Sequence, residues 1–166
     1  LRADTVISAS GNKDISFNGK VDSADATPRA LTVNTGGVTQ FGDGGADYVG
    51  HSFALASVTT DGPGSTVFDI TLDVNHPNSV KTTGSQTYGD AVVLNKDTVL
   101  TSTTSGDVWF KSTVDSDAVN TPRALTVNTG GATRFGDGGA DYVGHSFALA
   151  SVTTDGPGST VFDITL

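Results

Sequence analysis

The chain has 166 residues and a net charge of −9, and it contains no Cys, no Met and no Glu, so all 18 acidic residues are Asp. Without Cys no disulfide can form, and without clustered Lys and Arg the chain lacks the positive surface that binds nucleic acid or an anionic membrane. No apolar run approaches the ~18 residues that a membrane-spanning helix requires. Asp, Gly, Thr and Val dominate instead of helix formers, which predicts an all-β chain rich in turns.

In chain order, the first predicted elements are short strands that each end in an aromatic residue. Such an ending recurs every 20 to 27 residues, from DISF at 14–17 to STVF at 159–162. The seven aromatic residues are Phe17, Phe41, Phe68, Tyr88, Phe110, Phe135 and Phe162. An aliphatic residue lies 8 or 10 positions before each of them. Because side chains alternate along a strand, an even spacing lets both residues point to one side.

A longer repeat contains this short period. The 43 residues at 30–72 return at 124–166, 94 positions later. The copies differ only at two pairs of positions, Val38 and Ala132, and Gln40 and Arg134. In the strand VTQF, Phe41 and Thr39 share one parity, so the differing residues have the opposite parity and should face solvent.

The repeat extends upstream with an offset of 93, because 4–23 resembles 97–116, whereas 73–96 occurs once. We therefore expect one continuous segment, 1–166, built from a 94-residue unit (about 3–95 and 96–166, the second copy incomplete).

Gly, Asp, Asn and Ser fill the stretches between the strands, as turns require. A unit of 20–27 residues with three short strands, turns at its corners and one inward aromatic side chain predicts one rung of a parallel β-helix, or β-solenoid. We expect about seven rungs, four in each 94-residue unit, with the aromatic side chains stacked as an internal ladder. The alternative is two tandem immunoglobulin-like β-sandwiches, because ~94 residues suits one such domain.

Two Gly-rich loops, GDGGADYVG at 42–50 and at 136–144, are the weak candidates for a metal site. Calcium binding needs several oxygen ligands, which would come from Asp43, Asp47, Asp137 and Asp141. Glycine-rich calcium repeats place such a loop on successive rungs, whereas here it occurs once per unit. We therefore expect a corner loop, with no metal and no cofactor.

The same loops bring together residue types that are used in catalysis. These are Asp47, His51 and Ser52 in the first copy, and Asp141, His145 and Ser146 in the second. A catalytic triad is defined by geometry and not by proximity in sequence. We expect surface loops, no catalytic residues and no enzymatic activity.

Exposed aromatic side chains are weak candidates for ligand binding, since they can stack on sugars or partner surfaces. Trp109 has the opposite parity to Phe110 and should point outward, while Tyr48 and Tyr142 lie in the Gly-rich loops. The competing interpretation is that Trp109 covers apolar surface of the rod.

Three blocks carry a family resemblance: TTGSQTYGDAVVL, GDVWF followed by TVDS, and ALTVNTGG followed by FGD. They resemble the repeat regions of very large Gram-negative exoproteins of the filamentous-haemagglutinin type, which leave the cell by two-partner secretion. The resemblance covers essentially the whole chain. It implies a right-handed parallel β-helix, an extracellular or cell-surface location, and a role as a stalk or in adhesion.

We therefore expect a structural shaft of a large secreted or surface-attached bacterial adhesin or extracellular fibre. Its expected partners are further repeats of the same chain or end-to-end self-association, together with host or matrix glycans or proteins. Nucleic acid and membrane insertion are not expected. The alternative function is that of a glycan-binding or polysaccharide-degrading β-helix protein.

Overall fold

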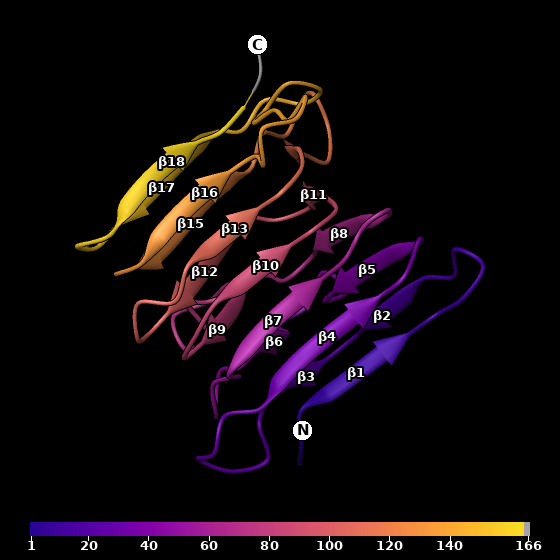
Figure 1. The fold of residues 1–166 in the computed structure, drawn as a ribbon, viewed down its shortest axis with the longest axis vertical. Coiled ribbons are helices and arrows are strands. Elements are labelled where there is room, and N and C mark those ends of the chain that lie inside the picture. The colour runs from indigo at the N-terminus through magenta and orange to yellow at the C-terminus, as the bar shows by residue number, and fades with distance from the viewer. Residues whose placement is uncertain (165–166) are drawn as a thin grey trace.

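The computed structural model describes residues 1–164, which form only strands, turns and loops. The chain winds through about six turns of a parallel β-solenoid, with the N-terminus at one end of the stack and the C-terminus at the other (Figure 1). The predicted β-solenoid is confirmed, with one turn fewer than the expected seven. The last two residues of the predicted segment 1–166 lie outside the described residues.

Each of the first five turns contributes a strand to three sheets, and neighbouring strands of a sheet are parallel and one turn apart. Sheet A contains β1 (Thr5–Ser8), β4 (Ala30–Asn34), β7 (Ser57–Thr60), β10 (Gln86–Tyr88), β13 (Val108–Phe110), β16 (Ala132–Phe135) and β18 (Ser159–Phe162). Sheet B contains β2 (Ile15–Phe17), β5 (Val38–Phe41), β8 (Ser65–Phe68), β11 (Ala91–Leu94) and β14 (Val114–Ser116). Sheet C contains β3 (Lys20–Val21), β6 (Tyr48–Val49), β9 (Val80–Thr82), β12 (Thr98–Ser102), β15 (Ala124–Thr129) and β17 (Ser151–Asp155).

Alternation along the strands separates the core from the surface. In β5, Thr39 and Phe41 are buried, whereas Val38 and Gln40 are half-buried on the outside. In the second copy Thr133 and Phe135 are buried in the same way, but Ala132 is only 8% exposed, so the expectation that it faces solvent is wrong for this residue. The inward side chains of all three sheets form one continuous hydrophobic core. Each large apolar side chain buried in it stabilises the fold by roughly 1.5–3 kcal/mol.

The two copies of the 43-residue repeat occupy different sheets. In the first copy β4 and β7 lie in sheet A, and β5 and β8 lie in sheet B. Their counterparts β15 and β17 lie in sheet C, and β16 and β18 lie in sheet A. The cause is a strand count: β15 is the eleventh strand after β4, and eleven is not a multiple of three. The 94-residue unit therefore spans three and two-thirds turns, which corrects the predicted four.

Candidate functional site

The structure brings the seven predicted ladder residues into one stack along the inside of the solenoid. Ring centroids of successive members lie 5.1–5.8 Å apart. The stacked residues are Phe17, Phe41, Phe68, Tyr88, Phe110, Phe135 and Phe162. The first three come from sheet B and the other four from sheet A. Since the rings touch one another from turn to turn, the stack links every turn to the next.

The ladder changes sheet between Phe68 and Tyr88. These two rings meet edge to face at 86°, whereas the other five contacts are stacked at 5–22°. Tyr88 lies directly above Thr60 in sheet A, and Leu94 takes the place above Phe68 in sheet B. The sequence carries one sign of this change of sheet. Phe68 and Tyr88 are 20 residues apart, which is the shortest spacing between successive ladder residues.

A buried carboxyl group lies beside this crossing. Asp90 is only 3% exposed, and its Oδ1 lies 2.6 Å from Thr66 Oγ1 and 3.0 Å from Thr60 Oγ1. The two hydroxyl oxygens are 2.8 Å apart. Asp90 Oδ2 is buried without a hydrogen-bond partner among residues 1–164. Burial raises the pKa of the Asp90 carboxyl, and the two threonine hydrogen bonds partly oppose that shift.

A second buried polar network joins the same crossing to the core. The Tyr88 hydroxyl donates to Gln86 Oε1 at 2.8 Å, and Gln86 Nε2 donates to Thr82 Oγ1 and to the Thr101 carbonyl at 3.1 and 3.0 Å. Burial raises the pKa of the Tyr88 hydroxyl. Sequence reasoning missed Gln86 and Asp90, although each lies two positions from Tyr88 and so shares its inward parity. Both networks lie in the interior, out of reach of a substrate.

The Gly-rich loops use their carboxylates to hold their own backbone. Asp47 Oδ2 accepts the Asp43 N–H at 3.2 Å, and Asp141 Oδ2 accepts the Asp137 N–H at 3.1 Å. Within the described range 1–164, no group of three or more His or Asp side chains is placed to hold a metal ion. In both copies the second Asp of the loop, Asp47 or Asp141, therefore binds the loop's own backbone.

An aromatic cluster surrounds Tyr48 at the outside of the first copy. The Tyr48 ring lies 4.8 Å from the His51 ring and 5.1 Å from the His76 ring, while Lys20 Nζ lies 5.2 Å from its centroid. Tyr48 is only 6% exposed, so the prediction that it protrudes is wrong. His76, which comes from the stretch that occurs once, provides part of that cover.

The second loop forms a smaller cluster, in which Tyr142 stacks on His145 at 4.5 Å. Between β8 and β9, His76 Nδ1 lies 3.0 Å from Asp73 Oδ2, and this hydrogen bond lowers the pKa of the Asp73 carboxyl. No hydrogen bond among residues 1–164 joins His51 to Asp47 or to Ser52. The loops therefore contain no assembled catalytic triad.

Trp109 points outward on β13, as predicted, but its indole is engaged by the protein. Nε1 donates to the Gly136 carbonyl of the next turn at 2.8 Å, and Lys111 Nζ lies 4.3 Å from the ring centroid. Arg134 on β16 pairs with Trp109, and its Nε lies 3.5 Å from Asp107 Oδ2. In the first copy, the equivalent residue Gln40 pairs with Ser16 instead of a tryptophan. The indole thus joins two turns, and the lysine occupies a ring face that a sugar would need.

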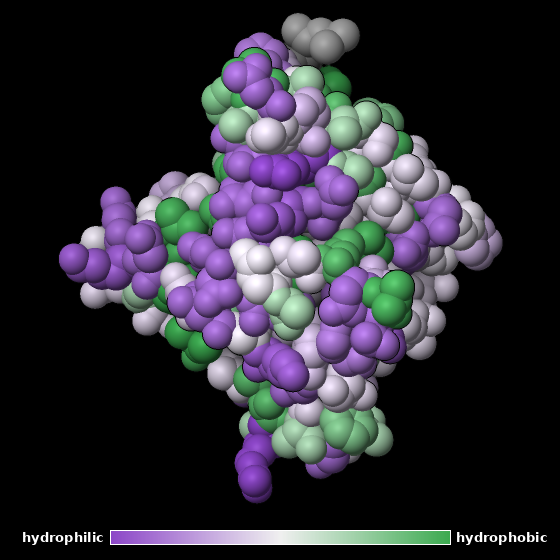
Figure 2. Space-filling view, turned by 180° about the vertical axis from the view of Figure 1, so that it is seen from behind, coloured by the Kyte–Doolittle hydropathy of each residue, from purple (hydrophilic) through white to green (hydrophobic). Residues whose placement is uncertain are grey.

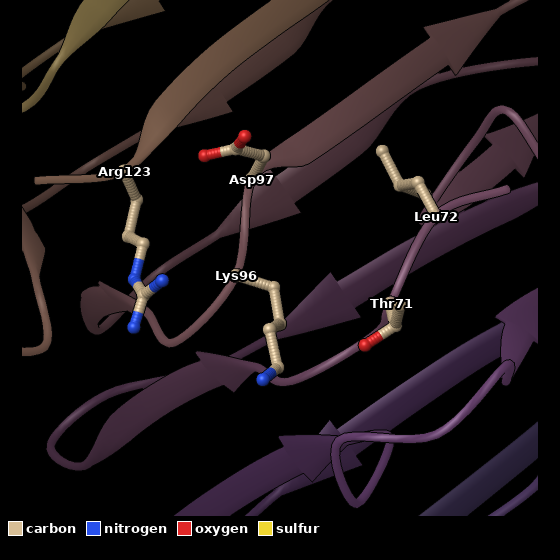
Figure 3. Close-up of a pocket in the computed structure, with 5 residues that line it drawn as sticks. All are labelled: Thr71, Leu72, Lys96, Asp97 and Arg123. Carbon is tan, nitrogen blue, oxygen red and sulfur yellow. The ribbon is translucent and has the colours of Figure 1, made fainter. Parts of the chain in front are cut away.

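One surface cavity has a volume of about 240 Å³ and is lined by Thr71, Leu72, Lys96, Asp97 and Arg123. Figure 3 shows the side chains of Lys96 and Arg123 extending in the same direction, away from the Asp97 carboxylate. Asp97 Oδ1 accepts the Ala124 N–H at 2.9 Å. The cavity therefore combines two cations and the Asp97 carboxylate with hydroxyl and apolar lining, so that its cations could pair with a small anionic ligand.

One of those cations is already paired. Arg123 makes two hydrogen bonds to Asp117, at 2.9 and 3.1 Å. They lower the pKa of the Asp117 carboxyl and raise the pKa of the Arg123 guanidinium. Lys96 makes no ion pair within residues 1–164. The positive charge that the cavity offers a ligand therefore comes chiefly from Lys96.

The face of the molecule seen in Figure 2 is a mosaic of hydrophilic and hydrophobic residues. The described part of the chain has no helix of the length and hydropathy needed to cross a membrane. No protein-family model, curated protein or solved structure matches the chain.

Proposed function

We propose that the chain is a structural shaft segment of a large secreted or surface-attached bacterial adhesin or fibre, without catalytic activity. The observation that carries this proposal is the aromatic stack, which passes through both copies of the repeat without interruption. Parallel pairing of backbones joins the same turns along all three sheets. Such a rod extends by adding further turns, and each repeated unit supplies more of them.

The placement of the two copies supports the same proposal. A binding site shared by the copies would be expected on one face, where a partner could contact both. Instead, the repeated loops leave the rod at different corners, because the second copy is shifted by one sheet. This placement is expected when the repeat makes the rod longer and does not form a binding site for a partner.

The length of the rod provides the first test. A chain carrying a second copy of residues 73–166 after residue 166 contains one more 94-residue unit, or three and two-thirds turns. At ~4.8 Å per turn, its longest dimension should increase by about 18 Å. Small-angle scattering or electron microscopy measures that increase. A longer chain of unchanged maximum dimension, or one that forms two separate particles, contradicts the shaft.

The extracellular location is tested separately. The chain should reach the outside of a Gram-negative cell when it is fused behind a secretion domain of the filamentous-haemagglutinin type and produced with its outer-membrane partner. The absence of Cys and the family resemblance support this expectation. Retention of the folded chain in the periplasm, with secretion of a control passenger, contradicts it.

One observation favours a second candidate function, the binding of an acidic glycan. The 240 Å³ cavity places Lys96 and Arg123 beside the Thr71 hydroxyl, a combination that suits a sugar carboxylate. Titration with uronic acid oligosaccharides, compared with a Lys96→Ala variant, tests this candidate. Binding that Lys96→Ala abolishes supports it, and the absence of saturable binding removes it.

A further inference from the structure

Two of the chain's three histidines meet beside the strands β6 and β9. The chain contains His51, His76 and His145, and it has no Cys. His51 and His76 are far apart in sequence, but their ring centroids lie 4.6 Å apart at an interplanar angle of 55°. His51 follows β6 and His76 precedes β9, and these strands pair in adjacent turns through Val49 and Val80. The fold, and not the local sequence, therefore brings the two imidazoles together.

The Tyr48 ring supports both histidines. His76 stacks on it with centroids 5.1 Å apart and planes 13° from parallel, and His51 packs against it at 4.8 Å. Tyr48 is buried, whereas both histidines are half-buried. The two imidazoles are therefore held on a buried aromatic ring and stay accessible to a small ligand from solvent.

Asp73 determines which nitrogen of His76 is available to a ligand. The two carboxylate oxygens of Asp73 lie 3.1 and 3.0 Å from His76 Nδ1. Because an ionised carboxylate only accepts hydrogen bonds, Nδ1 carries the proton, and Nε2 of the neutral ring keeps its lone pair. A carboxylate on the far nitrogen orients metal-binding histidines in this way. No hydrogen bond within residues 1–164 engages the His51 ring, so that ring also has a nitrogen to offer.

The separation of the two rings fits a shared metal ion. Zinc–nitrogen distances of about 2.0–2.1 Å and tetrahedral angles place the centroids of two bound imidazoles roughly 5 Å apart. The observed separation of 4.6 Å is close to this value. Imidazole suits Zn²⁺, Cu²⁺ and Ni²⁺, whereas Mg²⁺ and Ca²⁺ prefer oxygen. No third His or Asp side chain among residues 1–164 is placed to complete the group, so water would fill the remaining positions.

We propose that His51 and His76 bind one divalent transition-metal ion of the zinc class, with Asp73 as a positioning residue. The ion joins the loop between β8 and β9 to the loop after β6, and so links two adjacent turns. It binds the folded chain alone, because unfolding separates the two imidazoles, and it therefore stabilises the fold. The second copy offers no such pair, since Tyr142 stacks on His145, the only histidine of that copy.

The charges around the two rings favour a metal ion over an anion. An anion is the alternative ligand, because Lys20 Nζ lies 5.2 Å from the Tyr48 centroid. Asp73, however, contacts the His76 ring directly. Its negative charge repels an anion at this ring and strengthens the ring as a metal ligand. Inorganic phosphate therefore serves as the competing probe.

Isothermal titration calorimetry of the untagged 166-residue chain with Zn²⁺ tests the proposal. We expect saturable binding of one ion per chain. His51→Phe and His76→Phe keep an aromatic ring against Tyr48 but remove the ligand nitrogen, and each should weaken binding by roughly tenfold or more. Asp73→Asn keeps an oxygen for the loop backbone but removes the charge, and it should weaken binding by about tenfold. His145→Phe is the matched control and should leave the affinity unchanged.

Nuclear magnetic resonance identifies the ligand atoms. Long-range ¹H–¹⁵N spectra of the metal-free chain should show neutral His76 with its proton on Nδ1. Zn²⁺ should shift Nε2 of His76 and one ring nitrogen of His51, and it should leave the ring signals of His145 in place. Zn²⁺ should also raise the temperature of thermal unfolding of the wild type more than that of either ligand variant. Circular dichroism verifies that the variants fold.

Four results overturn the proposal. They are the absence of saturable Zn²⁺ binding up to ~1 mM, an affinity that His51→Phe and His76→Phe leave unchanged, an ion that holds two chains together in sedimentation, and binding of phosphate in place of Zn²⁺. The length of the rod is unaffected by any of them, so this proposal and the proposed shaft fail separately.

Discussion

The segments 30–72 and 124–166 have almost the same sequence and almost the same contacts, but they lie on different faces of the rod. Phe41 is paired with Phe17 in sheet B, and Phe135 is paired with Phe110 in sheet A. The register of each segment on the turn below is therefore the same in the two copies. The sequence of a strand therefore determines its register on the preceding turn. The sheet in which the strand lies depends on how many strands precede it in the chain.

The copies differ most in what lies above them. The end of the first copy is covered by the stretch that occurs once, which supplies β9, β10 and β11. Among residues 1–164, no strand covers the end of the second copy. Substitutions at equivalent positions therefore separate the contribution of a covering turn from the contribution of the sequence itself.

The largest expected contrast is between Phe68→Ala and Phe162→Ala. Phe68 is fully buried between Phe41 and Tyr88, so its truncation should lower the free energy of unfolding by about 3–5 kcal/mol. Phe162 is 58% exposed and has one ring neighbour in the stack, so its truncation should cost less than about 1 kcal/mol. Urea unfolding measures both. Equal losses would mean that the last turn is covered in solution.

Gly50→Ala and Gly144→Ala form the next contrast. Both glycines have positive φ, +78° and +69°, so alanine at either position costs about 1–2 kcal/mol. At Gly50 the new Cβ would also lie 1.9 Å from the Lys81 carbonyl oxygen of the turn above. We expect Gly50→Ala to cost about 3 kcal/mol in total. Equal destabilisation by Gly144→Ala would contradict the part played by the Lys81 carbonyl.

Thr66→Val and Thr160→Val should differ by a smaller amount. Thr66 is buried against Asp90, and its loss removes a hydrogen bond from an already under-bonded carboxyl group, at about 1–3 kcal/mol. Thr160 is exposed, so its replacement should change the free energy of unfolding by less than about 0.5 kcal/mol. Thermal unfolding of the two variants, with Thr153→Val as a control, measures the difference.

The dependence of stability on pH gives the smallest contrast, and it rests on Asp90, which has no equivalent among residues 96–164. Burial raises the pKa of Asp90 above that of the unfolded chain, so the folded state holds the proton more tightly. This group's contribution to stability therefore falls as the pH rises from its unfolded value through its raised folded value.

Asp90→Asn removes that contribution. The variant should gain stability relative to the wild type as the pH rises through this window, and the difference should level off above it. The lowered pKa values of Asp73 and Asp117 act in the opposite direction in both proteins, so they cancel in the comparison. Urea unfolding between acid and neutral pH measures the difference. A difference that does not change with pH would mean that Asp90 is not buried.

The sequence was sufficient to predict the solenoid and the aromatic stack, because both depend on a period that recurs along the chain. The even spacings around Phe41 and Phe135 define inward residues without any knowledge of the sheets. The number of strands per unit was not predictable in the same way, because 73–96 occurs once and its three short strands have no second copy for comparison.

The surroundings of Tyr48 were missed for a related reason. Its cover comes from His76 and Lys20, which are brought to it from neighbouring turns and are not repeated beside Tyr142. Parity alone predicted the outward direction of Trp109, but not the hydrogen bond to Gly136 or the position of Lys111 over the ring. A contact between two turns that is found at only one place in the chain produces no periodic pattern in the sequence.

Distances between spin labels test most directly whether the second copy of the repeat is shifted by one sheet relative to the first. Thr32 and Arg134 lie in one outward column of sheet A, four strand spacings apart, so labels at these sites should be separated by about 19 Å along the rod. Labels at the repeat-equivalent sites Gln40 and Arg134 lie on different sheets and should be farther apart. If the unit instead filled four whole turns, the Gln40–Arg134 distance would be the shorter one, and the account of the two copies would be wrong.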